Sequence, residues 1–128
     1  MQKLLVINAL RDQYYKDCHI LGSINVPLDD LANYIESSDK ETHIVVYCAS
    51  YHCTASHKAW HILHDLGFVN VLAYEGGMAE WVQKGYLAQG ACQEEYLNRQ
   101  EGPQDSDVAT ISAEELKEKM EEAGLLPH

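Results

Sequence analysis

Basic residues are scarce in this sequence of 128 residues, which has 9 lysines and arginines against 20 aspartates and glutamates. The formal net charge at pH 7 is -11. Nucleic-acid binding requires clustered Lys and Arg side chains that displace counterions from phosphates. The composition therefore argues against a nucleic-acid partner.

Long apolar runs are absent as well. The longest, such as Leu4 to Ile7 and Ile44 to Tyr47, fall far short of the roughly 20 residues that a membrane helix requires. The opening residues, Met1 to Leu10, contain one lysine and a short apolar stretch but no small-residue cleavage site. We therefore expect no membrane partner, and we interpret the opening as mature protein located in the cytoplasm.

The four cysteines form neither a CxxC pair nor the spacing of a structural zinc site. They are Cys18, Cys48, Cys53 and Cys92. In a cytosolic chain of this size, unpaired thiols are expected to be core residues or reactive groups. We interpret Cys18 and Cys92 as inert core residues.

Three histidines lie on one predicted helix, and two of them, His57 and His61, have the i,i+4 spacing used by metal sites. No neighbouring glutamate completes an HExxH pattern, so His57, His61 and His64 are interpreted as residues at the solvent boundary. We predict neither a metal nor a cofactor.

Short apolar runs alternate with helical patterns, which favours one α/β domain with a mainly parallel central sheet flanked by helices. A length of 128 residues suits a single domain with a real core. The expected strands are Leu4 to Ile7, Ile44 to Tyr47 and Val69 to Tyr74, and the expected helices are Leu28 to Ile35, Ser56 to Leu66 and Met78 to Lys84.

The pattern changes after residue 90. Residues 91–107 are polar, contain Gly102-Pro103 and show no sustained period, which is typical of a linker. Val108 to Ile111 is strand-like, and Ser112 followed by Glu115 predicts a capping box for a helix over Ala113 to Glu122. We therefore divide the chain into a core at 1–90, a polar linker at 91–107 and a segment at 108–128 that completes the same domain.

Cys48 directly follows a predicted buried strand and precedes a helix. Backbone N–H groups of the intervening loop can converge on such a sulfur, and the positive end of the helix dipole favours thiolate over thiol. This geometry indicates a reactive nucleophile without naming its substrate. An inert thiol at a strand end is an equally good interpretation of the geometry alone.

Several motifs add a family resemblance. The stretch HILGSINVPLDDL, from His19 to Leu31, resembles the HIPGAINIPL segment of rhodanese domains, and VVYC resembles the strand that delivers their catalytic cysteine. Further matches lie at Ser56 to Ala59, Leu66 to Phe68, Gly76-Gly77, Trp81 and Gly85. The resemblance, covering about Leu4 to Gly90, implies a rhodanese-like fold and a sulfurtransferase that carries sulfane sulfur as a persulfide on Cys48. Its implied partners are a sulfur donor (persulfide, polysulfide or thiosulfate) and a thiol or other nucleophilic acceptor.

The sequence departs from the rhodanese pattern at two places. Asn8 and Leu10 stand where an Asp-x-Arg is usual, with Arg11 adjacent. The active-site loop is about two residues longer than usual, contains no arginine and resembles a rhodanese subgroup with a second cysteine. Its residues are Cys48, Ala49, Ser50, Tyr51, His52, Cys53, Thr54, Ala55 and Ser56. Without a guanidinium to hold an oxyanion bidentately, we expect inefficient use of thiosulfate.

The second loop cysteine leaves alternatives open. Cys53 could resolve a persulfide or sulfenic acid on Cys48 through a disulfide, or it could pack under the loop. The missing arginine also keeps open a non-catalytic rhodanese-like module that binds a partner or senses redox state. A cysteine phosphatase is disfavoured, because such enzymes need an arginine to hold phosphate.

The C-terminal segment resembles the usual beginning of a rhodanese domain, a short strand followed by the phrase ISAEEL and a helix. That phrase occurs here at Ile111 to Leu116. The resemblance implies a circular permutation, with residues 108–128 returning to the edge left vacant before Leu4. An unrelated helix or a segment swapped between two molecules are the alternatives, so the chain is expected to be a monomer or a swapped dimer.

Overall fold

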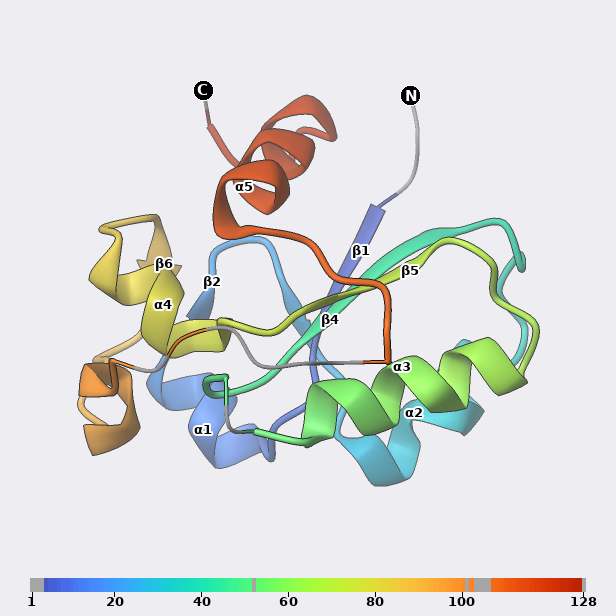
Figure 1. Ribbon diagram of the computed structural model, residues 1–128, viewed down its shortest axis with the longest axis horizontal. Helices are drawn as coiled ribbons and strands as arrows, with labels where there is room; N and C mark the ends of the chain where they lie inside the picture. The colour runs from blue at the N-terminus through green and yellow to red at the C-terminus, as the bar shows by residue number, and fades with distance from the viewer. Residues whose placement is uncertain (1–3, 52, 101, 103–106, 128) are drawn as a thin grey trace.

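A four-stranded parallel sheet forms the centre of the computed structural model, which describes residues 4–51, 53–100, 102 and 107–127 (Figure 1). The strand order is β3-β1-β4-β5. The bounds are β1 Leu4–Asn8, β3 Ile24–Asn25, β4 His43–Tyr47 and β5 Val71–Tyr74. The predicted α/β class with a mainly parallel sheet flanked by helices is confirmed.

Five α-helices and one 3-10 helix surround the sheet within the described residues. They are α1 Asp12–Asp17, α2 Leu28–Ile35, α3 Ala55–Asp65, α4 Gly77–Gln83, η1 Glu95–Asn98 and α5 Ala113–Glu122. A separate antiparallel pair is formed by β2 His19–Ile20 and β6 Ala88–Gln89. The strands of this pair are two residues long, which is too short for a periodic signal in the sequence.

Successive residues of each central strand enter opposite faces of the sheet, because side chains alternate along a strand. On one face, Ile7, Ile44 and Val46 pack with residues of α2 and α3. On the other, Val6, Val45 and Tyr47 pack with residues of α4 and α5. Both faces of the sheet are therefore covered, as expected of a parallel sheet whose strands are apolar throughout.

The C-terminal segment packs on this second face. Leu116 and Met120 of α5 are fully buried, and Leu126 is buried in the same cluster as Val6. The capping box is present, since Ser112 Oγ accepts the Glu115 N–H at 3.2 Å and the Glu115 side chain accepts the N–H of Ser112. In Figure 1, α5 lies on the same side of the molecule as the start of β1.

The strand predicted at Val108 to Ile111 is not formed as a strand. A single parallel bridge joins Thr110 to Ala73 of β5, with hydrogen bonds from Ala73 N to Ala109 O at 2.8 Å and from Ile111 N to Ala73 O at 3.1 Å. The cap of α5 begins at Ser112, directly after this bridge. The backbone therefore turns into the helix before a longer ladder can develop.

The segment predicted as a free linker is fastened at its beginning. A disulfide joins Cys92 to Cys18, whose Cα atoms are 4.6 Å apart, so the interpretation of these two residues as unpaired core thiols was wrong. The Asp17 carboxylate accepts the N–H groups of Gln93 and Glu94. Further along, η1 buries Leu97 in the same cluster as α4. Sequence spacing could not reveal a bond between cysteines separated by 74 residues.

Candidate active site

Cys48 lies at the end of β4, in the middle of the sheet, and its side chain is buried. Its carbonyl oxygen accepts the N–H of Met78 at 3.0 Å, and the Ala49 carbonyl accepts the N–H of Ala79 at 2.9 Å. The first turn of α4 is therefore in backbone contact with the first two loop residues. Gly77 is required there, because it has φ 63° and a Cβ would lie 2.5 Å from the Cys48 carbonyl oxygen.

The two loop cysteines are bonded to each other. A disulfide joins Cys48 to Cys53, with Cα atoms 6.3 Å apart. The Cys53 N–H also donates to the Ser50 carbonyl of the same loop at 3.0 Å. The predicted loop residue His52 lies outside the described residues. The structure thus brings the two sulfurs within bonding reach, which sequence spacing alone could not establish.

The remaining loop residues have different surroundings. Ser50 and Ser56 are buried, and Thr54 is the N-cap residue of α3 without a side-chain capping bond. Among the described atoms, the Ser56 hydroxyl has no hydrogen-bond partner. Ala55 lines a separate cavity of about 280 Å³ together with Arg11. The loop residues therefore do not all converge on one point.

Tyr51 is tied to α4 by a carboxylate. Its hydroxyl donates to Glu80 Oε2 at 2.6 Å, and the hydroxyl of Tyr74 donates to Glu80 Oε1 at 2.9 Å. Burial and the adjacent Glu80 carboxylate both raise the pKa of Tyr51, and the same causes raise the pKa of Tyr74. Both phenols are therefore neutral hydrogen-bond donors, and they hold the middle of the cysteine loop against α4.

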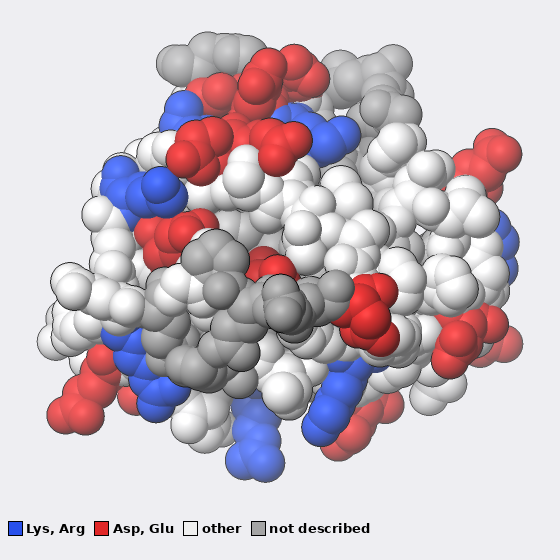
Figure 2. Space-filling view, in the orientation of Figure 1, with Lys and Arg blue, Asp and Glu red and all other residues white. Residues whose placement is uncertain are grey.

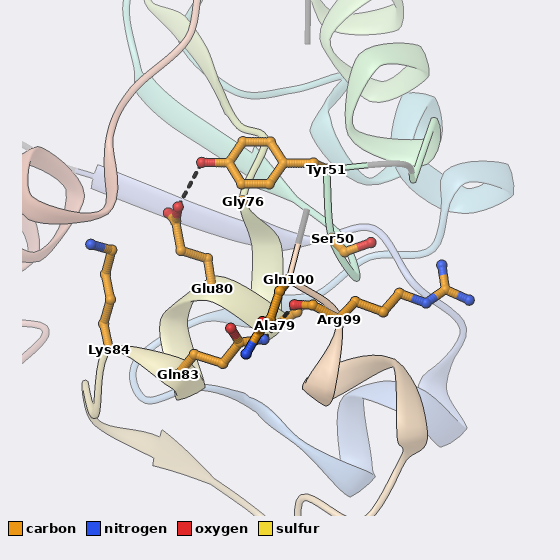
Figure 3. A pocket seen from close by; sticks show the side chains of 9 residues that line it. All are labelled: Ser50, Tyr51, Gly76, Ala79, Glu80, Gln83, Lys84, Arg99 and Gln100. Atoms are coloured by element: carbon orange, nitrogen blue, oxygen red, sulfur yellow. Dashed lines mark hydrogen bonds between the residues drawn. The ribbon is translucent and has the colours of Figure 1, made fainter. Parts of the chain in front are cut away.

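Tyr51 also borders a cavity of about 300 Å³ beside the loop. Figure 3 shows the cavity between the cysteine loop, α4 and the segment after η1, with Glu80 directed toward Tyr51. It is lined by Ser50, Tyr51, Gly76, Ala79, Glu80, Gln83, Lys84, Arg99 and Gln100. A small polar solute can occupy this volume next to the residues that separate the two cysteines.

The positive charges near this cavity are directed elsewhere. Lys84 Nζ lies 3.2 Å from the Glu114 carboxylate, and in Figure 3 the guanidinium of Arg99 extends away from Glu80. The side chain of Asn8, which replaces the usual aspartate, is buried and accepts the Leu10 N–H at 2.9 Å. Asn8 therefore stabilises the turn after β1 and leaves no charge at the site.

One imidazole contacts a carboxylate at the edge of the loop. His57, in the first turn of α3, has Nε2 2.6 Å from Oε2 of Glu75, which follows β5. The helical pattern of the sequence predicts His57 only as a residue at the solvent boundary, and no pattern singles out Glu75 or Glu80. The two glutamates flank the Gly76-Gly77 motif, but a motif gives no information about the groups that face its neighbours.

The surface has no concentration of positive charge on the face that Figure 2 shows, where Lys and Arg side chains are dispersed among acidic and uncharged ones. None of the helices in the described ranges has the length and apolar character that a bilayer crossing requires. Likewise, no cluster of three His, Cys, Asp or Glu side chains with the geometry of a metal site occurs among the described residues.

Comparisons with known proteins agree with this architecture. Residues 2–84 match the family described as the rhodanese-like domain. A thiosulfate sulfurtransferase GlpE from Coxiella burnetii is 35% identical over 78 residues, which are 60% of this chain and 71% of that protein. Among solved structures, the rhodanese-like domain from Anabaena sp. has a TM-score of 0.63 at 27% identity. The match covers 84% of this chain and 79% of the Anabaena chain.

A second solved structure, the BH2092 protein from Bacillus halodurans, has a TM-score of 0.63 at 27% identity over 70% of this chain. This chain spans 65% of the length of that protein. The matched family region contains the whole path from β1 through the cysteine loop to α4. The chain therefore belongs to the rhodanese-like domain family.

Proposed function

We propose that the protein is a sulfurtransferase that carries sulfane sulfur as a persulfide on Cys48 and passes it to a thiol or other nucleophilic acceptor. The supporting observation is the position of Cys48, which follows the central strand β4, precedes α3 and is bonded to a second cysteine of the same loop. Loop N–H groups and the N-terminus of α3 favour its thiolate. The GlpE relatives are named thiosulfate sulfurtransferases, which is consistent with this chemistry.

The proposed cycle begins with the reduced protein. The Cys48 thiolate attacks the sulfane sulfur of a donor RS–SH, the donor's S–S bond breaks, and RS⁻ leaves while Cys48 becomes Cys48–S–SH. An acceptor thiolate then attacks the outer sulfur, and Cys48 leaves as a thiolate. These steps need no external oxidant or reductant, because each attacking thiolate supplies the electron pair of the new S–S bond and the departing thiolate keeps the pair of the broken one.

Cys53 is proposed as the resolving thiol. Its thiolate attacks Sγ of Cys48–S–SH, releases HS⁻ and leaves the Cys48–Cys53 disulfide that the structure contains. A thiol reductant then regenerates both cysteines. Mild oxidation of the reduced protein by peroxide should produce the same disulfide through a sulfenic acid on Cys48, and peptide mapping would detect it. Oxidation of Cys48 to sulfinic acid with Cys53 untouched would contradict the resolving role.

The decisive experiment is intact-mass spectrometry of the reduced protein after incubation with a polysulfide. We expect wild type and Cys53→Ser to gain sulfur, the latter retaining it longer, while Cys48→Ser gains none. The Cys48→Ser change removes the nucleophile but little volume, so the fold is expected to persist. Equal sulfur loading of Cys48→Ser and wild type would show that Cys48 is not the carrier.

A redox-sensing module is the second candidate, and the same disulfide favours it. The loop has no arginine, and Cys48 is already oxidised in this structure. Such a module would cycle between dithiol and disulfide without accepting sulfur. Failure of reduced wild type to gain sulfur from any donor, together with rapid formation of the disulfide, would support this alternative.

We further propose that residues 108–128 complete the domain in the place where other rhodanese domains have their first strand and helix, which is a circular permutation within one chain. Its support is that Leu126 is buried in the cluster against which Leu4 packs, and that α5 lies on the same side of the molecule as the start of β1 (Figure 1). Joining His128 to Met1 and cutting within 92–106 should give a conventional order that folds and loads sulfur. A cut placed after Cys92 leaves this cysteine attached to residues 1–91. A rejoined protein that fails to fold would contradict the permutation.

The cytoplasmic location stays a proposal. The unpaired thiols that this location led us to expect are not found, because all four cysteines are bonded in the structure. The Cys18–Cys92 bond argues against a reducing compartment, where buried structural disulfides are rare. Alkylation of thiols in intact cells would decide: a cytoplasmic protein should have Cys18 and Cys92 alkylated.

A further inference from the structure

The ends of β4 and β5 place a carboxylate beside the sulfur-bearing loop. The two strands are parallel neighbours with Tyr47 opposite Tyr74, so the residues that follow them are Cys48 and Glu75. Adjacent strands are about 4.8 Å apart. The next residues, Gly76 and Gly77, lead into α4, whose backbone bonds to the Cys48 carbonyl. Glu75 therefore belongs to the segment that touches the cysteine.

His57 reaches this carboxylate from the other end of the loop. Cys53 is followed by the N-cap residue Thr54, and His57 is the third residue of α3. The distance of 2.6 Å between His57 Nε2 and Glu75 Oε2 ties the helix after the loop to the strand end before α4. The pair thus joins the two segments that follow the cysteine loop and β5.

The charges around the pair explain why an imidazole is useful there. Glu75 shares a cavity of about 260 Å³ with Tyr51 of the loop and with Ser112 and Glu115 of the α5 cap. Glu80 of α4 is bonded to Tyr51. These carboxylates disfavour a thiolate nearby, and the loop has no arginine to offset them. When it takes up a proton, the His57 imidazole offsets the Glu75 charge at contact distance.

The geometry also suits proton transfer. When Nε2–H donates to Glu75, Nδ1 carries the lone pair that can accept a proton, and the carboxylate stabilises the imidazolium that results. The His57 side chain is 28% exposed, whereas that of Glu75 is 10% exposed. A solute can therefore reach the imidazole, while the carboxylate behind it is largely shielded from water.

From this arrangement we propose that His57 is the general base that deprotonates the incoming acceptor thiol, and that Glu75 is the positioning residue that orients its ring and stabilises the imidazolium that forms. The inference rests on the proposed function for the persulfide reaction. The acceptor RSH gives its proton to His57, RS⁻ attacks the outer sulfur of Cys48–S–SH, and the Cys48–S bond breaks. The products are RS–SH and a Cys48 thiolate, which takes the proton from the imidazolium.

The same base acts when a thiol reduces the resting disulfide. RS⁻ attacks one sulfur of the Cys48–Cys53 bond, and the other sulfur leaves as a thiolate that the imidazolium protonates. A second RSH completes the reduction and forms RS–SR. This reaction requires no sulfur loading, so it tests the base independently of the sulfurtransferase proposal.

The experiment compares two acceptor thiols at neutral pH. 2-Mercaptoethanol is mostly protonated and needs a base, whereas 2-nitro-5-thiobenzoate is already ionised. Rates of persulfide transfer and of disulfide reduction are measured by mass spectrometry for wild type, His57→Gln and Glu75→Gln. The matched control is His61→Gln, one turn further along α3, where the side chain is exposed and faces Asp107.

We expect His57→Gln to slow both reactions with 2-mercaptoethanol at least about tenfold, since general bases typically contribute about 10²-fold or more. The rates with 2-nitro-5-thiobenzoate should stay within about twofold of wild type, because an ionised thiol bypasses the base. Glu75→Gln should show the same selectivity with a smaller loss, and His61→Gln should match wild type.

Equal slowing with both thiols would show that the pair only shapes the loop, and unchanged rates would show that it has no role; either result overturns the proposal. Thermal melting confirms that each variant is folded, and Glu75→Gln retains a hydrogen-bonding group if His57→Gln is unstable. If wild type accepts no sulfur, the sulfurtransferase proposal fails, and the disulfide reaction alone decides the role of His57.

Discussion

The hydroxyl oxygen of Tyr47 lies 2.8 Å from Oγ of Ser23 in the core, and it accepts the N–H of Ile20 at 3.0 Å. Tyr47 is the last residue of β4 and directly precedes Cys48. The hydrogen bonds therefore join the strand end that delivers the cysteine to the end of β2 and to the turn that follows it. The phenol can be buried here because its hydroxyl is hydrogen-bonded to Ser23 and to the Ile20 N–H.

Removing this hydroxyl should weaken the fold and change its response to alkali. Burial raises the pKa of Tyr47 from 10.0 to about 12, because the folded state favours the neutral phenol. Its contribution is therefore complete below about pH 10 and is lost as the pH rises from 10 toward 12. We expect Tyr47→Phe to lower the free energy of unfolding at pH 7 by about 1–3 kcal/mol, since the Ile20 N–H loses its partner.

The measurement is urea unfolding of wild type and Tyr47→Phe at pH 7, 9 and 11. The difference between them should shrink at pH 11, because wild type alone loses the Tyr47 contribution. Tyr34→Phe is the control, since Tyr34 is 52% exposed. A constant difference across this pH range would contradict the burial argument.

The Cys18–Cys92 disulfide should stabilise the domain. It closes a long loop, with a sequence separation of 74, and the loss of chain entropy in the unfolded state is worth about 4 kcal/mol for such a loop. In a Cys48→Ser/Cys53→Ser background, adding dithiothreitol should lower the free energy of unfolding by a few kcal/mol. If the denaturation midpoint is unaffected by the reductant, the bond does not constrain the unfolded chain.

Thiosulfate should be a poor sulfur donor. The loop contains no arginine, and at the adjacent cavity Lys84 is paired with Glu114 while the guanidinium of Arg99 extends away from Glu80 (Figure 3). The loop therefore offers no guanidinium of its own to hold the leaving sulfite oxyanion bidentately. Initial rates of Cys48 loading, followed by intact mass, should be at least about tenfold lower with thiosulfate than with polysulfide. A preference for thiosulfate in this comparison would show that another group binds the oxyanion.

The C-terminal segment should be essential to stability. Leu116 is fully buried in the cluster that covers one face of the sheet, so Leu116→Ala should cost about 2–5 kcal/mol in the free energy of unfolding. Glu118→Ala, on the exposed side of the same helix, is the control and should change little. Deleting residues 108–128 should abolish cooperative melting, because the loss approaches the whole stability of a small domain. A truncated protein with the wild-type melting temperature would show the segment to be an appendage.

Local patterns in the sequence were sufficient for the longer elements. The predicted bounds of α2, Leu28–Ile35, and α5, Ala113–Glu122, agree with the structure because their apolar spacing and caps lie within each segment. By contrast, α1 buries none of its residues and has no apolar stripe, so its formation depends on its surroundings.

The fold class and the position of Cys48 could be predicted from the sequence, because buried strands, helix signals and family motifs each lie within a short stretch of chain. The pairing of distant side chains could be found only in the folded structure: Cys18 with Cys92, and His57 with Glu75, pairs separated by 74 and 18 residues. Such contacts depend on strand register and helix packing, which bring together side chains that no local spacing relates.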